Sequence, residues 1–224
     1  MIVALRLWEI SAFQGFMQMA LQRRRVLAIP GVSFAKLLGT GRGETFTPRD
    51  ADPHTWGVLV ALDSEKSLDI FNKSSFISSW GSAPAFSADL APISSQGRWA
   101  NKEPFKVSSL PSTDGHVAAI TRARIKPSES LKFWRETPPV TESLRKASGL
   151  LGAIGIGEAP IGLQGTFSLW ESGADLRTFA YSSPAHKRAI ELTASRNWYS
   201  EELFARFHVL RADGILGGRL ITTQ

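Results

Sequence analysis

The chain has 224 residues, of which 43% are hydrophobic, so it can bury a core and is not a disordered tail. It contains no cysteine, which excludes disulfides, thiolate zinc sites, iron–sulfur clusters and a cysteine-ligated haem. The net charge of +6 comes from dispersed basic residues, and the run at 23–25 is expected at a helix end, so no nucleic-acid partner is predicted.

The first half of the chain predicts a strand, a helix, two strands and a second helix. The first strand covers 3–10 and places Val3, Leu5 and Leu7 on one face. The later elements are expected at 13–27, 31–44, 58–62 and 63–71. Large apolar side chains gather here and are expected to form core or to line an apolar pocket: Phe13, Phe16, Met17, Met19, Phe34 and Phe46.

The second half predicts the same order of elements. A strand over 117–125 precedes a helix between 128 and 147, which Pro138 and Pro139 are expected to break. The remaining elements are strands at 149–158 and 166–170, a helix from 171 to 179, and a closing strand at 206–211. Each half is therefore a split β-α-β unit of the ferredoxin-like type.

These repeats predict an α+β protein in which tandem ferredoxin-like repeats pair their sheets into one barrel. The first repeat is expected over 1–111 and the second over 112–224. The segment 77–111 fits neither pattern and is interpreted as a long loop that carries aromatic side chains. A cavity between the two sheets is expected to hold a ligand.

Two features outside the histidines are candidate sites. The glycine-rich segment 39–44 precedes no predicted helix, so a β-turn is favoured over a nucleotide site. Glu44 and Glu158 follow matching strands, and they are expected either to lie near one another or to cap turn amides.

The histidines do not have the spacing of a zinc or non-haem iron site. His54 is expected in solvent and His116 at a strand edge, whereas His208 is expected to face either the cavity or solvent. His186 lies on the small-residue face of a helix predicted after Ser183-Pro184. The residues alone favour a buried histidine bonded to a carbonyl group; the alternative is a haem ligand, because haem iron needs only one histidine.

Motifs along the whole chain resemble the spheroidene monooxygenase-like family. They are Phe13-Gln-Gly-Phe-Met, Ile29-Pro-Gly, the segment 36–48, Gly97-Arg-Trp-Ala-Asn-Lys-Glu-Pro-Phe105, Thr121-Arg-Ala, Phe133-Trp, Gly155-Ile-Gly-Glu158 and the segment 198–207. The resemblance implies a dimeric-α/β-barrel-type fold. It also implies a carotenoid ketolase-type monooxygenase that uses O₂ and electrons from a ferredoxin-like donor.

The resemblance further implies haem b, with His186 as the axial ligand of the iron. Arg98, Arg42 and Lys102 are the expected partners of the haem propionates, because cations pair with carboxylates. An apolar small molecule is the expected substrate. Two alternatives stay open, namely a cofactor-free monooxygenase of the same barrel class and a non-enzymatic barrel that binds a lipid, pigment or haem.

Location and assembly are the last expectations. No run of 18 apolar residues is present, so no membrane-spanning helix is predicted. A cytoplasmic protein is expected, with peripheral membrane contact left open. A tandem repeat closes its own barrel, so a homodimer is not required, although exposed strand edges would allow one.

Overall fold

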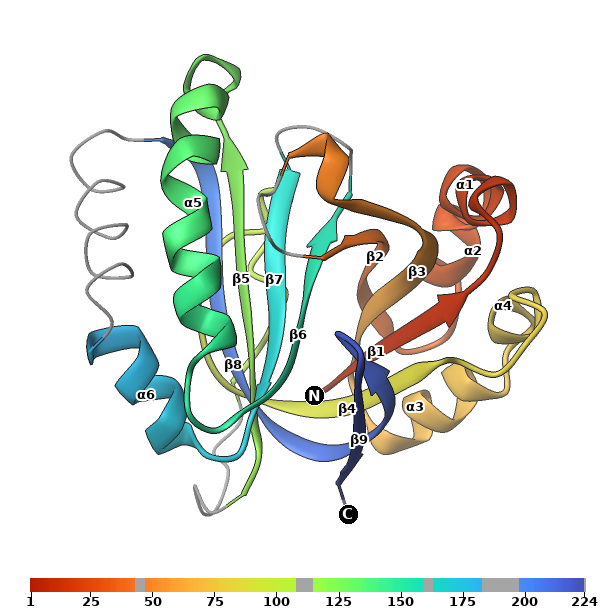
Figure 1. The fold of residues 1–224 in the computed structure, drawn as a ribbon. Coiled ribbons are helices and arrows are strands. Elements are labelled where there is room, and N and C mark those ends of the chain that lie inside the picture. The colour runs from red at the N-terminus through yellow and green to blue at the C-terminus, as the bar shows by residue number, and fades with distance from the viewer. Residues whose placement is uncertain (43–46, 108–114, 159–162, 183–197, 224) are drawn as a thin grey trace.

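A computed structural model describes residues 1–42, 47–107, 115–158, 163–182 and 198–223 (Figure 1). The first repeat consists of β1 (Ile2–Glu9), α1 (Ala12–Leu21), α2 (Arg23–Leu27), β2 (Val32–Gly41), η1 (Pro48–Asp50), β3 (Ala51–Leu62), α3 (Glu65–Asn72), α4 (Ser75–Ser78) and β4 (Phe86–Gly97). The second consists of β5 (Val117–Ile125), η2 (Pro127–Glu129), α5 (Ser130–Arg145), β6 (Leu150–Gly157), β7 (Leu163–Trp170), α6 (Gly173–Ser182), β8 (Tyr199–Leu216) and β9 (Arg219–Thr223).

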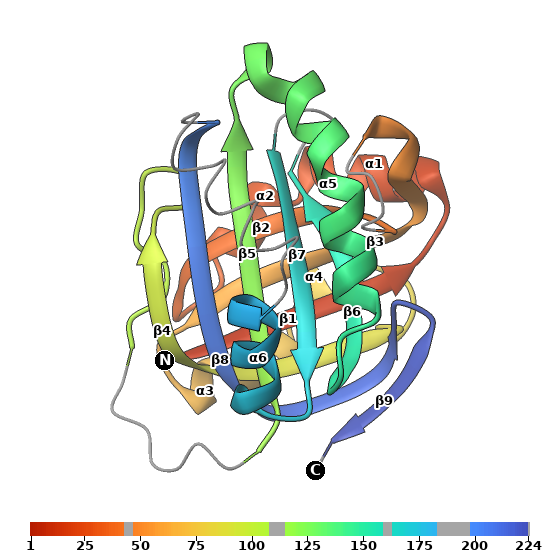
Figure 2. The ribbon, with the colours of Figure 1, turned by 60° about the vertical axis from the view of Figure 1, so that its left-hand side comes forward.

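The strands form a closed antiparallel barrel. Their order is β4-β1-β3-β2-β6-β7-β5-β8, and β8 pairs back onto β4, while β9 extends the sheet beyond β8. The helices α1 to α4 lie outside one half of the barrel, and α5 and α6 lie outside the other (Figures 1 and 2). The predicted fold class, two ferredoxin-like repeats in one barrel, is confirmed.

The same local signals build both repeats. Gly31 and Gly149 precede β2 and β6 with φ of +82° and +73°, the left-handed region that glycine adopts without a steric cost. Ser64 and Ser172 then cap the helices after β3 and β7, because each hydroxyl accepts a hydrogen bond from the backbone three residues later. These caps confirm the prediction that an acidic residue and a serine mark the start of each of these two helices.

The barrel interior is filled by hydrophobic side chains. Val3, Leu5 and Leu7 point inward from β1 as predicted. They pack against inward residues from the other strands, including Phe34, Leu59, Phe86, Leu90, Ile120, Phe167, Leu203 and Phe207. Hydrophobic side chains therefore face one another between the two sheets, where the cavity is expected.

The two repeats meet along two unequal seams. Between β4 and β8, eleven residue pairs run from Phe86 to Gly97. Between β2 and β6 there are only three, which join 39–41 to 155–157. The interior side chains of Leu151 and Ile154, which precede this short seam on β6, are only partly buried.

Three predicted element boundaries were wrong. The segment 77–111 is not one long loop, because Phe86–Gly97 forms β4 and pairs with both β1 and β8. Pro138 and Pro139 do not break their helix: α5 continues through them and its Leu144 packs against the sheet cluster of Val117, Leu150 and Trp170. The closing strand is longer than 206–211, because pairing with β4, β5 and β9 supports the whole of β8.

Two further expectations about this region are tested. The helix over 13–27 is not continuous, because it divides at Gln22, but the basic run does lie at a helix end, since Arg24 and Arg25 are in the last turn of α2. Of the apolar set in this region, Phe34 is buried, whereas Phe13, Phe16 and Met17 expose 77%, 66% and 38% of their surfaces. Phe46 lies outside the described residues.

Candidate active site

Four charged side chains meet inside the barrel, where the alternation of the strands would place apolar ones. Lys36 lies between the inward residues Phe34 and Leu38 of β2, and Arg122 follows Ile120 on β5. Glu158 follows β6 and Glu201 lies near the start of β8. The side chains of Lys36, Arg122, Glu158 and Glu201 expose 11%, 3%, 19% and 10% of their surfaces.

Ion pairs connect the four residues in a chain. Glu158 accepts from Lys36 through Oε2, and its Oε1 lies 3.4 Å from Nη2 of Arg122. The other guanidinium nitrogen of Arg122 donates to Glu201. Two cations and two carboxylates therefore neutralise one another, as buried charges must to offset the loss of hydration.

Trp99 occupies the centre of this cluster. Its indole Nε1 donates to Glu158, and the ring is 1% exposed. The guanidinium carbon of Arg122 lies 5.4 Å from the ring centroid and Nζ of Lys36 lies 6.0 Å from it, which are cation–π distances. The charged cluster thus fixes one large aromatic side chain at the end of the apolar core.

A strained turn holds Trp99 in place. Ala100 and Asn101 both have positive φ, 53° and 61°, and the backbone closes between Trp99 and Lys102. The amides of Ala100 and Asn101 donate to the carboxylate of Glu201 over 3.1 and 2.7 Å. Glu201 therefore stabilises the backbone conformation that an alanine disfavours.

The carboxyl of Glu201 stays ionised more readily than an ordinary glutamate. Burial alone would raise its pKa, but hydrogen bonds from the Asn101 amide, Arg122 and the Ala100 amide together hold the pKa below the ordinary value of 4.5. The group therefore serves as a fixed acceptor. The cluster's polar atoms satisfy one another, so its chemical role is to position Trp99 and the strand ends.

The expected propionate partners lie at the surface. Arg98 and Lys102 flank Trp99 in the same turn, and Arg98 forms an exposed 3.8 Å pair with Glu103. Arg42 follows β2, and its backbone N–H donates to Asp50 and its carbonyl accepts from Arg145. The structure thus brings Arg98 and Lys102 together, and it places Arg42 on a different strand end.

The expected iron ligand His186 and the helix predicted around it lie outside the described residues, as does Glu44. His54 is exposed, as predicted. His116 precedes β5, with its ring Nδ1 3.2 Å from the Glu171 carbonyl oxygen. His208 lies between the inward residues Phe207 and Val209, so it faces outward.

Two indole groups of the second repeat have no partner among the described residues. The Nε1 atoms of Trp134 and Trp198 are buried without a hydrogen bond. Both are donors, and Trp198 directly follows the segment that carries His186. An unsatisfied buried donor costs free energy, so these groups suit a ligand with acceptor oxygens, such as a carboxylate-bearing cofactor. Among the described residues, no three His, Asp or Glu side chains gather as a metal site.

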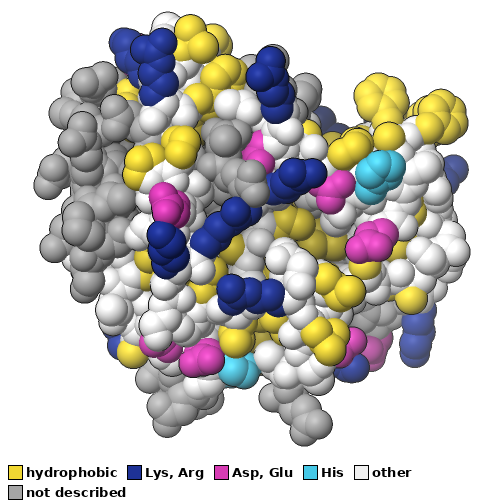
Figure 3. Space-filling model, in the orientation of Figure 1, with side chains coloured by type: hydrophobic (Ala, Val, Ile, Leu, Met, Phe, Trp, Pro, Cys, Tyr) yellow, Lys and Arg dark blue, Asp and Glu magenta, His cyan; other side chains and the backbone are white. Residues whose placement is uncertain are grey.

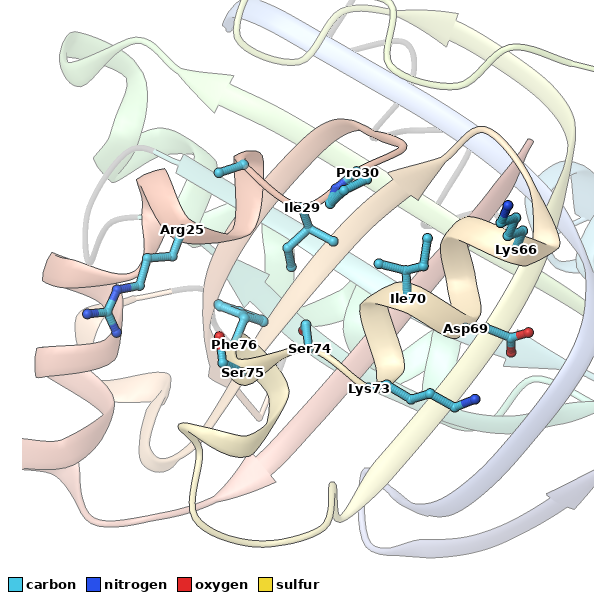
Figure 4. Close-up of a pocket in the computed structure, with 11 residues that line it drawn as sticks. Arg25, Ile29, Pro30, Lys66, Asp69, Ile70, Lys73, Ser74, Ser75 and Phe76 are labelled. Atoms are coloured by element: carbon cyan, nitrogen blue, oxygen red, sulfur yellow. The ribbon is translucent and has the colours of Figure 1, made fainter.

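A groove of about 950 Å³ lies outside the barrel between α2, α3 and α4. Ile29, Ile70 and Phe76 line its apolar part, with Arg25 on the α2 side and Lys73 on the α3 side (Figure 4). It is open to solvent and is separated from the charged cluster by the sheet of the first repeat. No helix in the described parts of the chain is long and apolar enough to cross a membrane.

Sequence reasoning missed Lys36, Arg122 and Glu201. The signal was nevertheless present, because each occupies an inward position in a strand whose other inward residues are apolar. A charged residue in that register is buried if the strand forms, and it then needs a partner.

A closed barrel of two ferredoxin-like repeats places the chain in the dimeric-α/β-barrel class. The solved structure of an aldoxime dehydratase has the same fold, with a TM-score of 0.55 and 10% identity over 93% of this chain and 80% of that one. No protein-family model matches the chain.

Curated relatives identify the family. The spheroidene monooxygenase of Rhodobacter capsulatus is 36% identical over 217 residues, which cover 95% of this chain and 87% of the relative. That of Rubrivivax gelatinosus is 36% identical over 219 residues, with 96% and 81% covered. The chain belongs to the spheroidene monooxygenase family, and it is a monooxygenase.

Proposed function

We propose that the chain is a haem-dependent carotenoid monooxygenase that forms a ketone on a long apolar substrate. The observation that carries this proposal is the 36% identity to spheroidene monooxygenase over 95% of the chain. The name of that relative gives both the class of reaction and a carotenoid substrate.

The proposed reaction is two hydroxylations at one carbon. In each, O₂ takes up two electrons and two protons, one oxygen atom enters a C–H bond and the other leaves as water. The second hydroxylation gives a geminal diol, which loses water to leave the ketone. A ferredoxin-like protein is the proposed source of electrons.

Haem would supply the activation of O₂ when bound. His186 would hold the haem iron, and the exposed cations Arg98, Arg42 and Lys102 would pair with the propionates. The unpaired indole donors of Trp134 and Trp198 support a bound group with acceptor oxygens in the second repeat.

The chain's own residues would have a positioning role. The ion pairs of Arg122 with Glu158 and Glu201 hold the ends of β5, β6 and β8 together. Trp99 closes the apolar interior at this end, so water is excluded from the core beneath it. A rigid, dry frame of this kind suits a reaction in which an activated oxygen species must be kept from solvent.

An absorption spectrum tests the cofactor. Protein expressed with ample haem is expected to show a Soret band, and His186→Ala is expected to lose it. His54→Ala removes an exposed histidine and is the matched control, expected to keep the band. Equal bands in both variants would overturn the assignment of His186.

Turnover tests the reaction itself. With spheroidene, O₂, a ferredoxin and its reductase, the product is expected to gain one oxygen atom and lose two hydrogen atoms by mass spectrometry. Colourless protein that still oxidises the substrate would favour the cofactor-free alternative. Protein that binds the pigment without consuming O₂ would favour a binding barrel.

A further inference from the structure

Helix α1 presents its apolar side to solvent. Its buried positions are Gly15 and Gln18, and the following residue Gln22 is also buried. Met19 packs partly buried against the core, whereas the other large hydrophobic residues of α1 are exposed: Phe13 by 77%, Phe16 by 66%, Met17 by 38% and Leu21 by 63%. A surface helix normally buries such a stripe against the core, so this orientation is the reverse of the usual one.

Hydrogen bonds and close packing fix the orientation of α1. The amide of Gln18 donates to the Ser79 carbonyl over 2.7 Å, and that of Gln22 donates to the Ser79 hydroxyl over 3.3 Å. Gly15 lies so close to Trp56 that a Cβ there would overlap the indole ring. Turning the apolar stripe inward would break these contacts, so its exposure is built into the fold.

Positive charge follows the stripe directly in the chain. The next helix, α2, starts with Arg23, Arg24 and Arg25, all exposed, and its Leu27 exposes 44%. Figure 3 shows hydrophobic side chains projecting from the edge of the molecule on the side where α1 lies in Figure 1. We call Phe13, Phe16, Met17, Leu21 and Arg23–Arg25 the α1–α2 face.

We propose that the α1–α2 face docks on the surface of a bilayer that contains anionic phospholipids. Aromatic and aliphatic side chains beside a cluster of cations are what an interfacial helix presents, because the first enter the acyl boundary and the second pair with headgroup phosphates. A second copy of the chain fits this face less well, since its own face would bring three more arginines. The proposal concerns binding alone and does not rest on the proposed reaction.

Vesicle co-sedimentation, without substrate or reductant, tests the proposal. Wild-type protein is expected to bind vesicles of phosphatidylcholine with 30% phosphatidylglycerol, and to bind pure phosphatidylcholine much more weakly. The triple variant Arg23→Gln, Arg24→Gln, Arg25→Gln is expected to lose about 100-fold in affinity for the anionic vesicles, from about fivefold per arginine. High salt is expected to weaken wild-type binding in the same way.

Matched variants distinguish binding through the α1–α2 face from general effects of charge and hydrophobicity. Lys132→Gln, Lys146→Gln, Arg177→Gln removes three exposed cations from the second repeat and is expected to keep wild-type binding. Phe13→Ser, Phe16→Ser is expected to lose about tenfold or more, whereas Leu220→Ser, which changes an 80% exposed side chain on β9, is expected to lose nothing. Circular dichroism and Tm check that every variant is folded.

The absence of cysteine offers an independent readout. Phe13→Cys and Leu220→Cys each create one labelling site for an environment-sensitive fluorophore such as NBD. Anionic vesicles are expected to raise the fluorescence at position 13 and leave that at position 220 unchanged.

Three results would overturn the proposal. They are no binding by the wild type, equal binding of the two triple variants, or equal fluorescence changes at the two labelled positions. A dimer that Phe13→Ser, Phe16→Ser dissociates, with vesicle binding unaffected, would assign the face to a second copy.

Discussion

Arg122 and Glu201 are 79 residues apart in the chain, yet their side chains pair inside the barrel with 3% and 10% of their surfaces exposed. The pair joins β5 to β8, and through Glu201 it reaches the backbone of the turn that carries Trp99. One buried guanidinium thus ties together the strand ends on which the cluster depends.

Removing this guanidinium is expected to destabilise the protein strongly. Arg122→Met would leave Glu201 and Glu158 with too little compensating charge, at a cost of about 3–5 kcal/mol in the free energy of unfolding measured with urea. Arg124→Met, two residues along β5 and exposed, is the control and should change that free energy by less than about 0.5 kcal/mol. Similar losses in the two variants would show that the buried pairs have no special role.

Stability is expected to fall in acid through Glu201. Its folded pKa is below the ordinary 4.5, so its contribution is complete above that value and disappears as the pH falls through the folded pKa. Glu201→Gln should therefore be less stable than wild type at pH 7, and the gap should narrow below about pH 4.5. Urea unfolding at several pH values between 3 and 7 measures the difference in stability between the two proteins. A difference that stays constant over this range would contradict the lowered pKa of Glu201.

Relieving the strained turn is expected to stabilise the fold. Ala100 has φ of 53°, which costs an alanine about 1 kcal/mol and a glycine almost nothing. Ala100→Gly is therefore expected to raise the free energy of unfolding by about 0.5–1 kcal/mol. Asn101→Gly is the comparison, because asparagine tolerates this conformation, and its gain should be near zero. A loss of stability in Ala100→Gly would indicate that the turn is unstrained.

The matching glycines of the two repeats should respond alike to substitution. Gly31→Ala and Gly149→Ala would combine a strained φ with overlap, against Ser67 in one repeat and Asp175 in the other. Each is expected to cost about 3 kcal/mol in urea unfolding. Gly218→Ala has a similar φ of +78° but open space around it, so about 1 kcal/mol is expected there. Equal costs at all three positions would mean that the overlap is relieved by small shifts.

The repeat order and the barrel were predictable because they depend on local signals. The alternation in β1, the glycines before β2 and β6, and the serine caps are all readable within a few residues. β4 was missed because its alternation is masked by serine, proline and glycine. It forms because β1 and β8 supply partners that no local pattern reveals.

The candidate site was harder to predict than the fold. Glu158 and Trp99 lie within motifs that the sequence shows, but their partners come from distant strands. The inward position of Lys36 can be explained only once β6 is known to lie beside β2, because β6 brings its partner Glu158. Phe13 and Phe16 were expected to form core or to line an apolar pocket, because hydrophobic residues in a helix usually do so. Gln18 and Gln22 are buried instead, with carbonyl and hydroxyl partners on Ser79 that only the fold brings near.

The three-pair contact between β2 and β6 has a consequence for motion. Glycines occupy both ends of it on each strand, so few side chains interlock across it, and Thr40 and Ile156 form its one central pair. Thermal opening of the barrel therefore requires breaking the fewest hydrogen bonds between β2 and β6, while the β4–β8 seam stays intact. Amide protons along this line should exchange with deuterated solvent sooner than those of the longer β4–β8 seam.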